Sequence, residues 1–347
     1  MKVKAIKFVA FVMYYLGITR LFYLLNCKAK RIITFHNVIP HQLLPCGRNI
    51  GLTDTEESFR FKIRQIKRFL KITVDLFDGV GATITFDDGY KNQSEIAGRI
   101  LNEEGNIPAI IFASGRNIGN VDPSKALIVD LLMHWTSLAP NGLYRLTSKD
   151  GGNIDFEMTF INREQIWQKI IWPNFTKDGE SKGRCLLLQL DKLYSIKKVL
   201  KKCCPDYLRL RLTGINNYDI ITLQNKGWLI GWHTQEHFPL SKLPDVSLLE
   251  YEIGSCPDYM KQVVFSYPYG EEASVDKQCI EFAKANGFPC AVSNLPDSDN
   301  WSGFFLPRFT LSNNMYLLHF ELSGLKYFIK KKKLLPKINI NEQNCIL

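Results

Sequence analysis

Two aspartates, Asp87 and Asp88, stand side by side at the end of a short apolar and β-branched run that reads TITFDDG over residues 83–89. Far downstream, His233 and His237 stand four residues apart, a spacing that places both imidazoles on one face of a helical turn. One carboxylate and two imidazoles suit a catalytic zinc ion, because three protein ligands leave positions for water and substrate. We therefore predict that Asp88, His233 and His237 bind zinc or another divalent transition metal, and that Asp87 remains as a base.

Each motif also has a purely structural interpretation. Asp-Asp-Gly after a strand is a common turn, in which the aspartate side chains accept local backbone hydrogen bonds and the glycine takes a positive φ. Two histidines four residues apart can be a chance surface pair. The conjunction favours a metal site, because the 347 residues contain only six histidines and two of them have this spacing.

Hydrophobic patterning predicts the elements that position these motifs. Helical spacing of apolar residues occurs over residues 56–70 and 94–101, between strand-like runs. This alternation predicts a parallel sheet or barrel with helices outside, and α/β barrels place their chemistry at the strand ends. The strand-like runs are residues 31–36, 82–86, 108–112, 228–232, 263–267 and 290–293.

One long segment interrupts the alternation. Between about residues 120 and 217 the pattern changes to helical runs, such as residues 126–138 and 186–200, mixed with polar loops. We interpret this segment as an insertion into a single catalytic domain that covers residues 29–325. The insertion would either shape a substrate groove or dock a partner.

The chain is basic, with a net charge of +10, and part of the excess lies in the run Lys330–Lys333 of a predicted C-terminal tail, residues 326–347. The sequence has no zinc-finger spacing and no long basic helix, so we expect no nucleic-acid partner. An anionic membrane surface is the partner that fits better, and a solvated basic tail is the structural alternative.

Residues 1–28 form a separate apolar segment. Lys2 and Lys4 precede an apolar run over residues 8–18, and no small-residue cleavage site follows it. A span through a membrane would place Arg20 in the hydrocarbon, which is unfavourable. We therefore predict a helix that lies at a membrane interface or anchors the chain, with a helix packed on the domain as the alternative. The nine cysteines contain no C-x-x-C pair and are predicted to be reduced.

The motifs together resemble those of the polysaccharide deacetylases with a NodB-homology domain, carbohydrate esterase family 4. TFDDG at 85–89 is similar to the first family motif, whose first Asp is the general base and whose second Asp binds the metal. HTQEH at 233–237 resembles the motif that completes the metal triad. SYPYG at 266–270 is similar to the third motif, which implies that Pro268 and Tyr269 line the substrate groove and that the Tyr269 backbone N–H helps to stabilise an oxyanion.

Ser266 departs from the family pattern, because many members carry there an arginine that pairs with the catalytic aspartate. LPRF at 306–309 resembles the L-P-R segment of a large subgroup, which assigns this pairing to Arg308 rather than to a surface role. LLH at 317–319 resembles the fifth motif, whose histidine is the general acid, and core packing of His319 is the alternative. His36 resembles a histidine that is common at the end of the first strand, on the substrate side.

The resemblance spans roughly residues 31–309 and implies a distorted (β/α)7-type barrel with a large helical insertion. The implied activity is metal-dependent removal of acetyl groups from N-acetylated sugars of a polysaccharide or cell-envelope glycan. An O-acetyl esterase and a catalytically silent glycan-binding module are the alternatives. Reduced cysteines favour the cytoplasmic face of a membrane, whereas polymer deacetylation usually implies the cell envelope, so the predicted membrane association leaves its side open. No oligomeric state is predicted.

Overall fold

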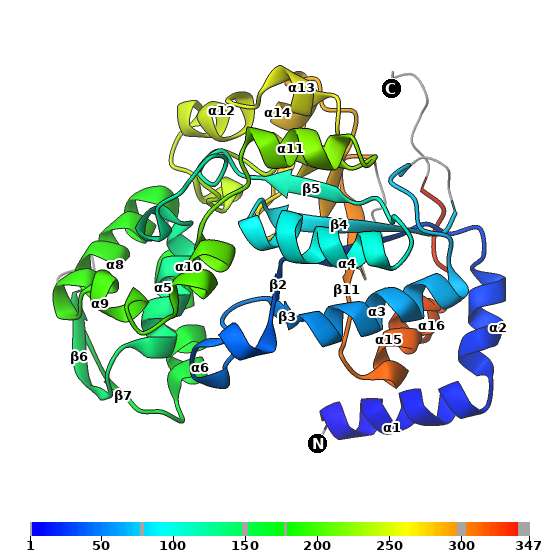
Figure 1. Ribbon diagram of the computed structural model, residues 1–347, viewed down its shortest axis with the longest axis horizontal. Helices are drawn as coiled ribbons and strands as arrows, with labels where there is room; N and C mark the ends of the chain where they lie inside the picture. Colours follow the sequence, from blue (N-terminus) through cyan, green and yellow to red (C-terminus); the bar gives the residue numbers. More distant parts are fainter. Residues whose placement is uncertain (1, 77–79, 148–151, 177–178, 297–302, 339–347) are drawn as a thin grey trace.

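The computed structural model describes the chain except for residues 1, 77–79, 148–151, 177–178, 297–302 and 339–347 (Figure 1). Its centre is a seven-stranded parallel sheet with the strand order β8-β5-β4-β1-β11-β10-β9. Six strands lie within the runs predicted as strands or extend them, and β11 was not predicted. The strands are β1 (Arg31–Phe35), β4 (Ala82–Asp88), β5 (Ile110–Ala113), β8 (Leu229–Trp232), β9 (Phe265–Ser266), β10 (Ala291–Ser293) and β11 (Leu306–Thr310).

The sheet curls until its outer strands, β8 and β9, approach each other. Gly231 of β8 is required at this approach, because a Cβ there would lie 2.6 Å from the carbonyl oxygen of Val264. His233 then joins the two edges, since its Nδ1 forms a 2.7 Å hydrogen bond with the carbonyl oxygen of Ser266. No backbone ladder joins β8 to β9 within the described part of the chain. The predicted distorted (β/α)7-type barrel is therefore confirmed, and the barrel is nearly closed.

Alternation along the strands separates the barrel interior from its outer face. Ile33, Ile84 and Ile111 belong to the large apolar cluster that packs against the helices. The residues that alternate with them form a smaller cluster inside the barrel, to which β1, β5, β10 and β11 contribute Ile32, Ile110, Phe112, Val292 and Leu306. Asp87 pairs in register with Phe112, one of these interior residues, so its side chain also points into the barrel.

Helices cover the outside of the barrel (Figure 1). The first of them, α3, begins where the Thr55 side chain accepts a hydrogen bond from the backbone N–H of Ser58, and it buries Phe59, Ile63 and Ile66. Two short strands, β2 (Asn37–Ile39) and β3 (Thr53–Thr55), pair beside it. The outer helices are α3 (Glu56–Phe69), the π-helical η3 (Gln93–Ala97), α4 (Gly98–Glu103), α11 (Asn217–Gln224), α12 (Val246–Gly254), α13 (Asp258–Lys261) and α14 (Lys277–Ala285), with 3-10 turns η1 (His41–Leu43), η2 (Pro45–Gly47) and η6 (Leu240–Lys242).

The predicted insertion forms a lobe beside the barrel, at the left of Figure 1, with an apolar core of its own. Its two ends are held side by side, because Gly119 N–H donates to the Ile215 carbonyl at 2.8 Å and Gly214 N–H donates to the Asn120 carbonyl at 2.9 Å. The lobe is not purely helical, since an antiparallel hairpin of β6 (Gly142–Thr147) and β7 (Asn153–Met158) was not predicted. The remaining elements are η4 (Pro123–Lys125), α5 (Ile128–Leu138), α6 (Arg163–Ile166), the π-helical η5 (Trp167–Ile171), α7 (Trp172–Thr176), α8 (Gly179–Leu193), α9 (Ile196–Leu200) and α10 (Pro205–Leu212).

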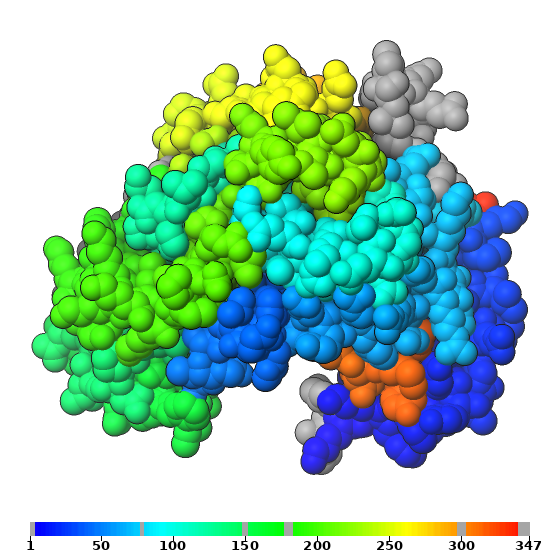
Figure 2. Space-filling model, in the orientation of Figure 1, coloured from blue at the N-terminus to red at the C-terminus, as the bar shows by residue number. Residues whose placement is uncertain are grey.

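The N-terminal segment forms two helices, α1 (Lys2–Tyr15) and α2 (Ile18–Leu25), which pack on α15 (Met315–Leu322) and α16 (Leu325–Lys331). Gly17, with a φ of 73°, separates α1 from α2. Among the described helices none is long and apolar enough to cross a membrane alone; α1 and α2 reach that length only as a pair, bent by 78°. The predicted basic tail begins inside α16, and Leu335 is still buried. Figure 2 shows the N-terminal helices on the surface, beside the C-terminal ones.

Candidate active site

Asp87 is the last residue but one of β4 and is almost fully buried. Arg308 of β11 donates two hydrogen bonds to its carboxylate, from Nη1 to Oδ1 at 2.6 Å and from Nη2 to Oδ2 at 2.7 Å. The Ser266 hydroxyl donates to Oδ1 at 3.3 Å, and His36 Nε2 lies 3.6 Å from Oδ2. The predicted pairing of Arg308 with Asp87 is therefore present, and Ser266, which replaces the arginine common in the family, adds a weaker contact to the same carboxylate.

Asp88 lies next to Asp87 but turns its carboxylate to a different set of partners. His237 Nε2 lies 3.2 Å from Asp88 Oδ1, and His233 Nε2 lies 3.7 Å from the same oxygen. The three side chains are buried, and one potential ligand atom from each lies within 4.8 Å of the others. The predicted convergence of Asp88, His233 and His237 is therefore observed.

The donor set fits a metal ion. Asp88 Oδ1 is buried and has no hydrogen-bond partner among the described residues, which is costly unless a cation binds there. His233 Nδ1 is occupied by the Ser266 carbonyl at 2.7 Å, so this nitrogen carries the proton and the Nε2 lone pair is free to bind a metal. Two imidazoles and one carboxylate are ligands that zinc and similar divalent ions accept.

The backbone around the two histidines differs from the prediction. Residues 233–239 form an irregular loop after β8, not a helical turn. Thr234 and His237 both have a φ of 65°, in the left-handed region, and His237 N–H donates to Thr234 Oγ1 at 3.1 Å. The changes of chain direction at Thr234 and His237, rather than helical periodicity, bring the His237 ring next to the His233 ring, with the ring centroids 4.8 Å apart.

The neighbouring carboxylates have opposite electrostatic environments. Burial alone would raise the pKa of Asp87, but the guanidinium of Arg308, together with two imidazoles, holds it well below its ordinary range. Burial raises the pKa of Asp88 well above its ordinary value, and the nearby Asp130 carboxylate adds to the effect. Burial also lowers the pKa of His237 to about 3 and that of His36 to about 4, so both imidazoles are neutral near pH 7. A bound cation would favour the ionised Asp88 and the neutral imidazoles.

Three further predicted site residues have different outcomes. Tyr269 and His36 line the groove that contains the triad. The Tyr269 hydroxyl donates to the His237 carbonyl at 3.2 Å, and its φ of 63° turns the chain at the groove wall. Pro268 is buried and is not among the described lining residues of this groove, so its contribution is to the turn behind Tyr269.

His319 is not brought to the site. Its Nδ1 hydrogen-bonds with the Tyr23 hydroxyl at 3.0 Å, and its Nε2 lies 3.2 Å from Gln65 Oε1. Its ring also packs on Phe69, the last residue of α3, which lies beside the start of β4. Asp87 lies near the other end of that strand. The structural alternative, core packing, describes this histidine, and the prediction of a general acid at His319 is corrected.

The insertion forms one wall of the groove, whose volume is about 440 Å³. Trp167, Gln168 and Trp172 of the lobe face Asp88 and the two predicted histidine ligands across the cavity. Trp172 packs edge-on against Tyr269, with ring centroids 5.1 Å apart. Sequence patterning identified the insertion but not these tryptophans, since nothing in a helical run marks the side chains that face a distant loop.

A buried ion pair of the lobe also reaches the groove. Arg211 Nη2 lies 2.5 Å from Asp130 Oδ1, and Tyr90, which follows the Asp-Asp-Gly turn, donates its hydroxyl to Asp130 Oδ2. Burial would raise the pKa of Asp130, but Arg211 holds it below its ordinary value. Arg211 Nη1 and Nε have no partner among the described residues and belong to a groove-lining side chain. No sequence signal pointed to this pair, because its members are 81 positions apart and share no motif.

Comparison with known proteins gives a likeness in structure only. No protein-family model and no curated relative matches the sequence. Among solved structures, the chain is similar to the Streptococcus pyogenes deacetylase PplD in complex with acetate, with 10% identity, a TM-score of 0.47, and coverage of 86% of this chain and 96% of that one. The putative polysaccharide deacetylase BA0330 from Bacillus anthracis is 12% identical, with a TM-score of 0.48 and coverage of 85% of this chain and 68% of that one. IcaB from Ammonifex degensii is 10% identical, with a TM-score of 0.45 and coverage of 86% of this chain and 97% of that one.

Proposed function

We propose that the protein is a metal-dependent hydrolase that removes acetyl groups from N-acetylated sugars of a polysaccharide or cell-envelope glycan. One observation carries the proposal: two adjacent aspartates at the end of β4 have opposite partners. Asp87 is paired with Arg308, and Asp88 faces two neutral imidazoles with a buried oxygen that lacks a hydrogen bond. Such a division supports a hydrolytic site with a metal ligand and a separate base.

We propose Asp88, His233 and His237 as ligands of zinc or a similar divalent ion. A bound ion of this kind polarises a carbonyl and lowers the pKa of a coordinated water toward neutrality. His233 is held in the tautomer that a ligand requires by the Ser266 carbonyl. Because the same Ser266 also donates to Asp87, one residue of β9 orients both the metal ligand and the base.

Asp87 is the proposed proton acceptor. Arg308 fixes its orientation through two hydrogen bonds and keeps it ionised, so the carboxylate is available to take a proton from water. The backbone N–H of Tyr269, whose ring packs against Trp172 of the lobe, is the proposed donor to the developing oxyanion. The amide bond to the acetyl group breaks, and acetate and a free amino sugar leave.

The leaving amine needs a proton, and His319 is not at the site. His36 is our candidate for handling this proton, because it lines the groove and its Nε2 lies 3.6 Å from Asp87 Oδ2. In this role His36 passes the proton that Asp87 has taken to the nitrogen of the leaving amine. The reaction balances, because one water is consumed: its hydroxyl group joins the acetyl carbon and its proton joins the amine nitrogen.

The side chains that the lobe contributes to the groove support the proposal that the substrate is a glycan. Trp167 and Trp172 line the groove, where their rings offer apolar faces. Sugar rings present C–H faces that pack on aromatic rings of this kind. We propose that the lobe binds the sugar residues that flank the acetylated one.

Acetate release by the purified full chain tests the proposal. The protein is assayed with zinc and then with a chelator on N-acetylglucosamine oligomers and on O-acetylated xylan, and bound metal is measured in parallel. Chelator-sensitive release from the first substrate supports the proposal. Release from the xylan alone would identify an O-acetyl esterase, and no release from either by metal-loaded protein would favour a silent glycan-binding module.

A further inference from the structure

The two N-terminal helices expose an apolar surface. One side of the pair is fixed to the domain, because Ala10 and Phe22 are buried against Phe320 and Leu325. The other side is open: Leu16 and Leu24 are each 69% exposed, and their neighbours are exposed as well. An apolar surface of this extent on a folded domain marks an interaction site. The exposed apolar side chains, called here the apolar face, are Phe8, Leu16, Leu21, Leu24 and Leu25, with Phe11 and Tyr15 at its edge, where their rings also contact Tyr316 of α15.

Only positive charge accompanies the apolar face. The first 53 residues contain no aspartate or glutamate, whereas Lys4, Lys7, Arg20 and Lys28 all belong to this segment. Any partner that covers the apolar face, whether a protein or a lipid bilayer, therefore contacts positive charge around the edge of that face. Apolar side chains next to lysine and arginine are the pattern of a helix that lies in the interface of an anionic membrane.

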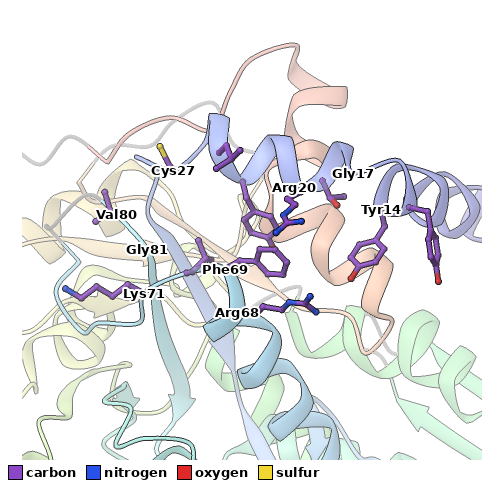
Figure 3. A pocket seen from close by; sticks show the side chains of 14 residues that line it. Tyr14, Gly17, Arg20, Cys27, Arg68, Phe69, Lys71, Val80 and Gly81 are labelled. Atoms are coloured by element: carbon purple, nitrogen blue, oxygen red, sulfur yellow. The ribbon is translucent and has the colours of Figure 1, made fainter.

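A cavity of about 670 Å³ opens beside the apolar face, between α2 and the C-terminal end of α3 (Figure 3). Its floor is aromatic, because Tyr23 and Phe69 stack with their ring centroids 4.5 Å apart. Figure 3 shows Arg20 and Arg68 reaching from the two helices into the space beside Phe69, whereas Lys71 points away from it. This cavity is larger than the groove at the carboxylate pair and shares no lining residue with it.

The cavity has the charge of an anion site. None of its fourteen lining residues is acidic, and three are basic. Within the described ranges, no carboxylate lies within ion-pair distance of Arg20 or Arg68. Two guanidinium groups without carboxylate partners, over an aromatic floor, match a phosphate group that carries a glycerol or acyl stem.

We propose that the apolar face and this cavity together bind a membrane that contains anionic phospholipid. The side chains of the apolar face enter the interfacial region, and the phosphate of one lipid lies between Arg20 and Arg68. The helices lie in the interface because α1, with 14 residues at about 1.5 Å each, is shorter than the hydrocarbon core of roughly 30 Å. The packing of Ala10 and Phe22 on the domain also holds the pair flat against it. This inference does not depend on the proposed hydrolysis.

Sedimentation of the full chain with vesicles tests the proposal. Vesicles of phosphatidylcholine alone are compared with vesicles that also contain phosphatidylglycerol, at constant ionic strength. The pocket variant is Arg20→Gln/Arg68→Gln, and the matched control is Lys197→Gln/Lys198→Gln on α9, which removes the same charge from the opposite side of the molecule. Leu16→Gln/Leu24→Gln changes the apolar face without touching the buried core.

We expect the unmodified protein to prefer the anionic vesicles. The pocket variant should bind them roughly 30-fold more weakly, at about 1 kcal/mol for each basic residue, and the control should change less than about twofold. The leucine variant should lose binding to both kinds of vesicle. Equal binding to the two kinds by the unmodified protein would overturn the proposal, and so would equal losses in the pocket and control variants. Unchanged melting temperatures establish that all the variants are folded.

Discussion

Arg308 and Asp87, 221 positions apart in the sequence, form a bidentate ion pair in the barrel interior with contacts of 2.6 and 2.7 Å. The pair leaves the adjacent Asp88 as the carboxylate that faces His233 and His237. Two residues with the same side chain therefore receive different properties from their neighbours. The proposed division into base and metal ligand follows from this arrangement.

Asp87→Asn should lower kcat for acetate release by at least about 100-fold, because an amide cannot accept the proton. Metal content should stay near that of the unmodified protein, since Asp87 is not in the predicted ligand set. Elemental analysis and turnover are measured on the same preparation. Asp88→Ala is the matched variant, and it should lose the metal as well as activity. A near-normal rate in Asp87→Asn would rule out the base assignment.

His36→Gln and His319→Gln separate the two histidines that the sequence offered for proton transfer. His36→Gln should lower kcat by roughly 100-fold, the scale of a lost general acid–base group. His319→Gln should stay within about twofold, because His319 is held by Tyr23 and Gln65 away from the groove. The kinetics are measured on the same oligomer. A large loss in His319→Gln with an unchanged melting temperature would return the acid role to His319.

His319 should instead influence stability at acid pH. Burial lowers its pKa to about 4, with a smaller effect from Arg68, so the folded protein holds it neutral. Unfolded chains protonate histidine below about pH 6.5, so its contribution to stability is lost as pH falls from there toward 4. The difference in unfolding free energy between pH 7 and pH 5 should therefore be smaller in His319→Gln. Urea titrations of both proteins at the two pH values measure it. An identical difference would show that His319 is already protonated at pH 5 in the fold.

Trp172→Ala should weaken the binding of oligomers. The ring lies in the groove wall against Tyr269, and loss of one aromatic contact of about 0.5–1.5 kcal/mol raises KM by up to roughly tenfold. Tyr218→Ala, an exposed aromatic on α11, is the control and should change nothing. KM is compared for an oligomer and for a small acetyl substrate. Equal effects on both substrates would mean that Trp172 supports the fold of the site and does not bind flanking sugars.

Gly214→Ala should destabilise the protein by about 3 kcal/mol or more. A Cβ at Gly214 would lie 1.5 Å from the carbonyl oxygen of Asn117, a clash that only backbone movement relieves. The effect should reach the site, because the Asn117 side chain donates to the Asp88 carbonyl at 3.0 Å. Gly152→Ala, where a Cβ meets nothing within 4 Å, is the matched control. Denaturant midpoints that fall equally in the two variants would contradict the prediction.

Hydrophobic patterning predicted a parallel sheet or barrel, and the aspartate pair with the two histidines predicted the cluster of Asp88, His233 and His237 that the structure brings together. The distorted (β/α)7 type was implied by the family resemblance, not by the pattern. The six predicted strands are short apolar runs after helices, and a parallel barrel brings their ends together whatever the detail of the loops. Strand β11 escaped prediction because it contains Pro307, which is unusual within a central strand. The hairpin of β6 and β7 escaped because both strands are mostly exposed and therefore lack a clear apolar alternation.

The remaining site residues could not be predicted for a different reason. His319 matched a three-residue motif, but an apolar helix presents the same letters when its histidine is a core residue. The pair Asp130–Arg211 and the tryptophans of the lobe depend on how the lobe sits against the barrel, and one sequence carries no signal for such long-range packing. Arg308 was found through its resemblance to a family segment, not through its spacing from Asp87.

The two ends of the lobe leave the barrel side by side, joined by the hydrogen bonds between Gly119 and Ile215 and between Gly214 and Asn120. A segment anchored in this way can lengthen, shorten or be exchanged during evolution without moving the strands that hold Asp87 and Asp88. The barrel and the lobe can therefore diverge at different rates. Under the proposed function, exchange of the lobe would change the glycan that the groove binds and would leave the carboxylate pair in place.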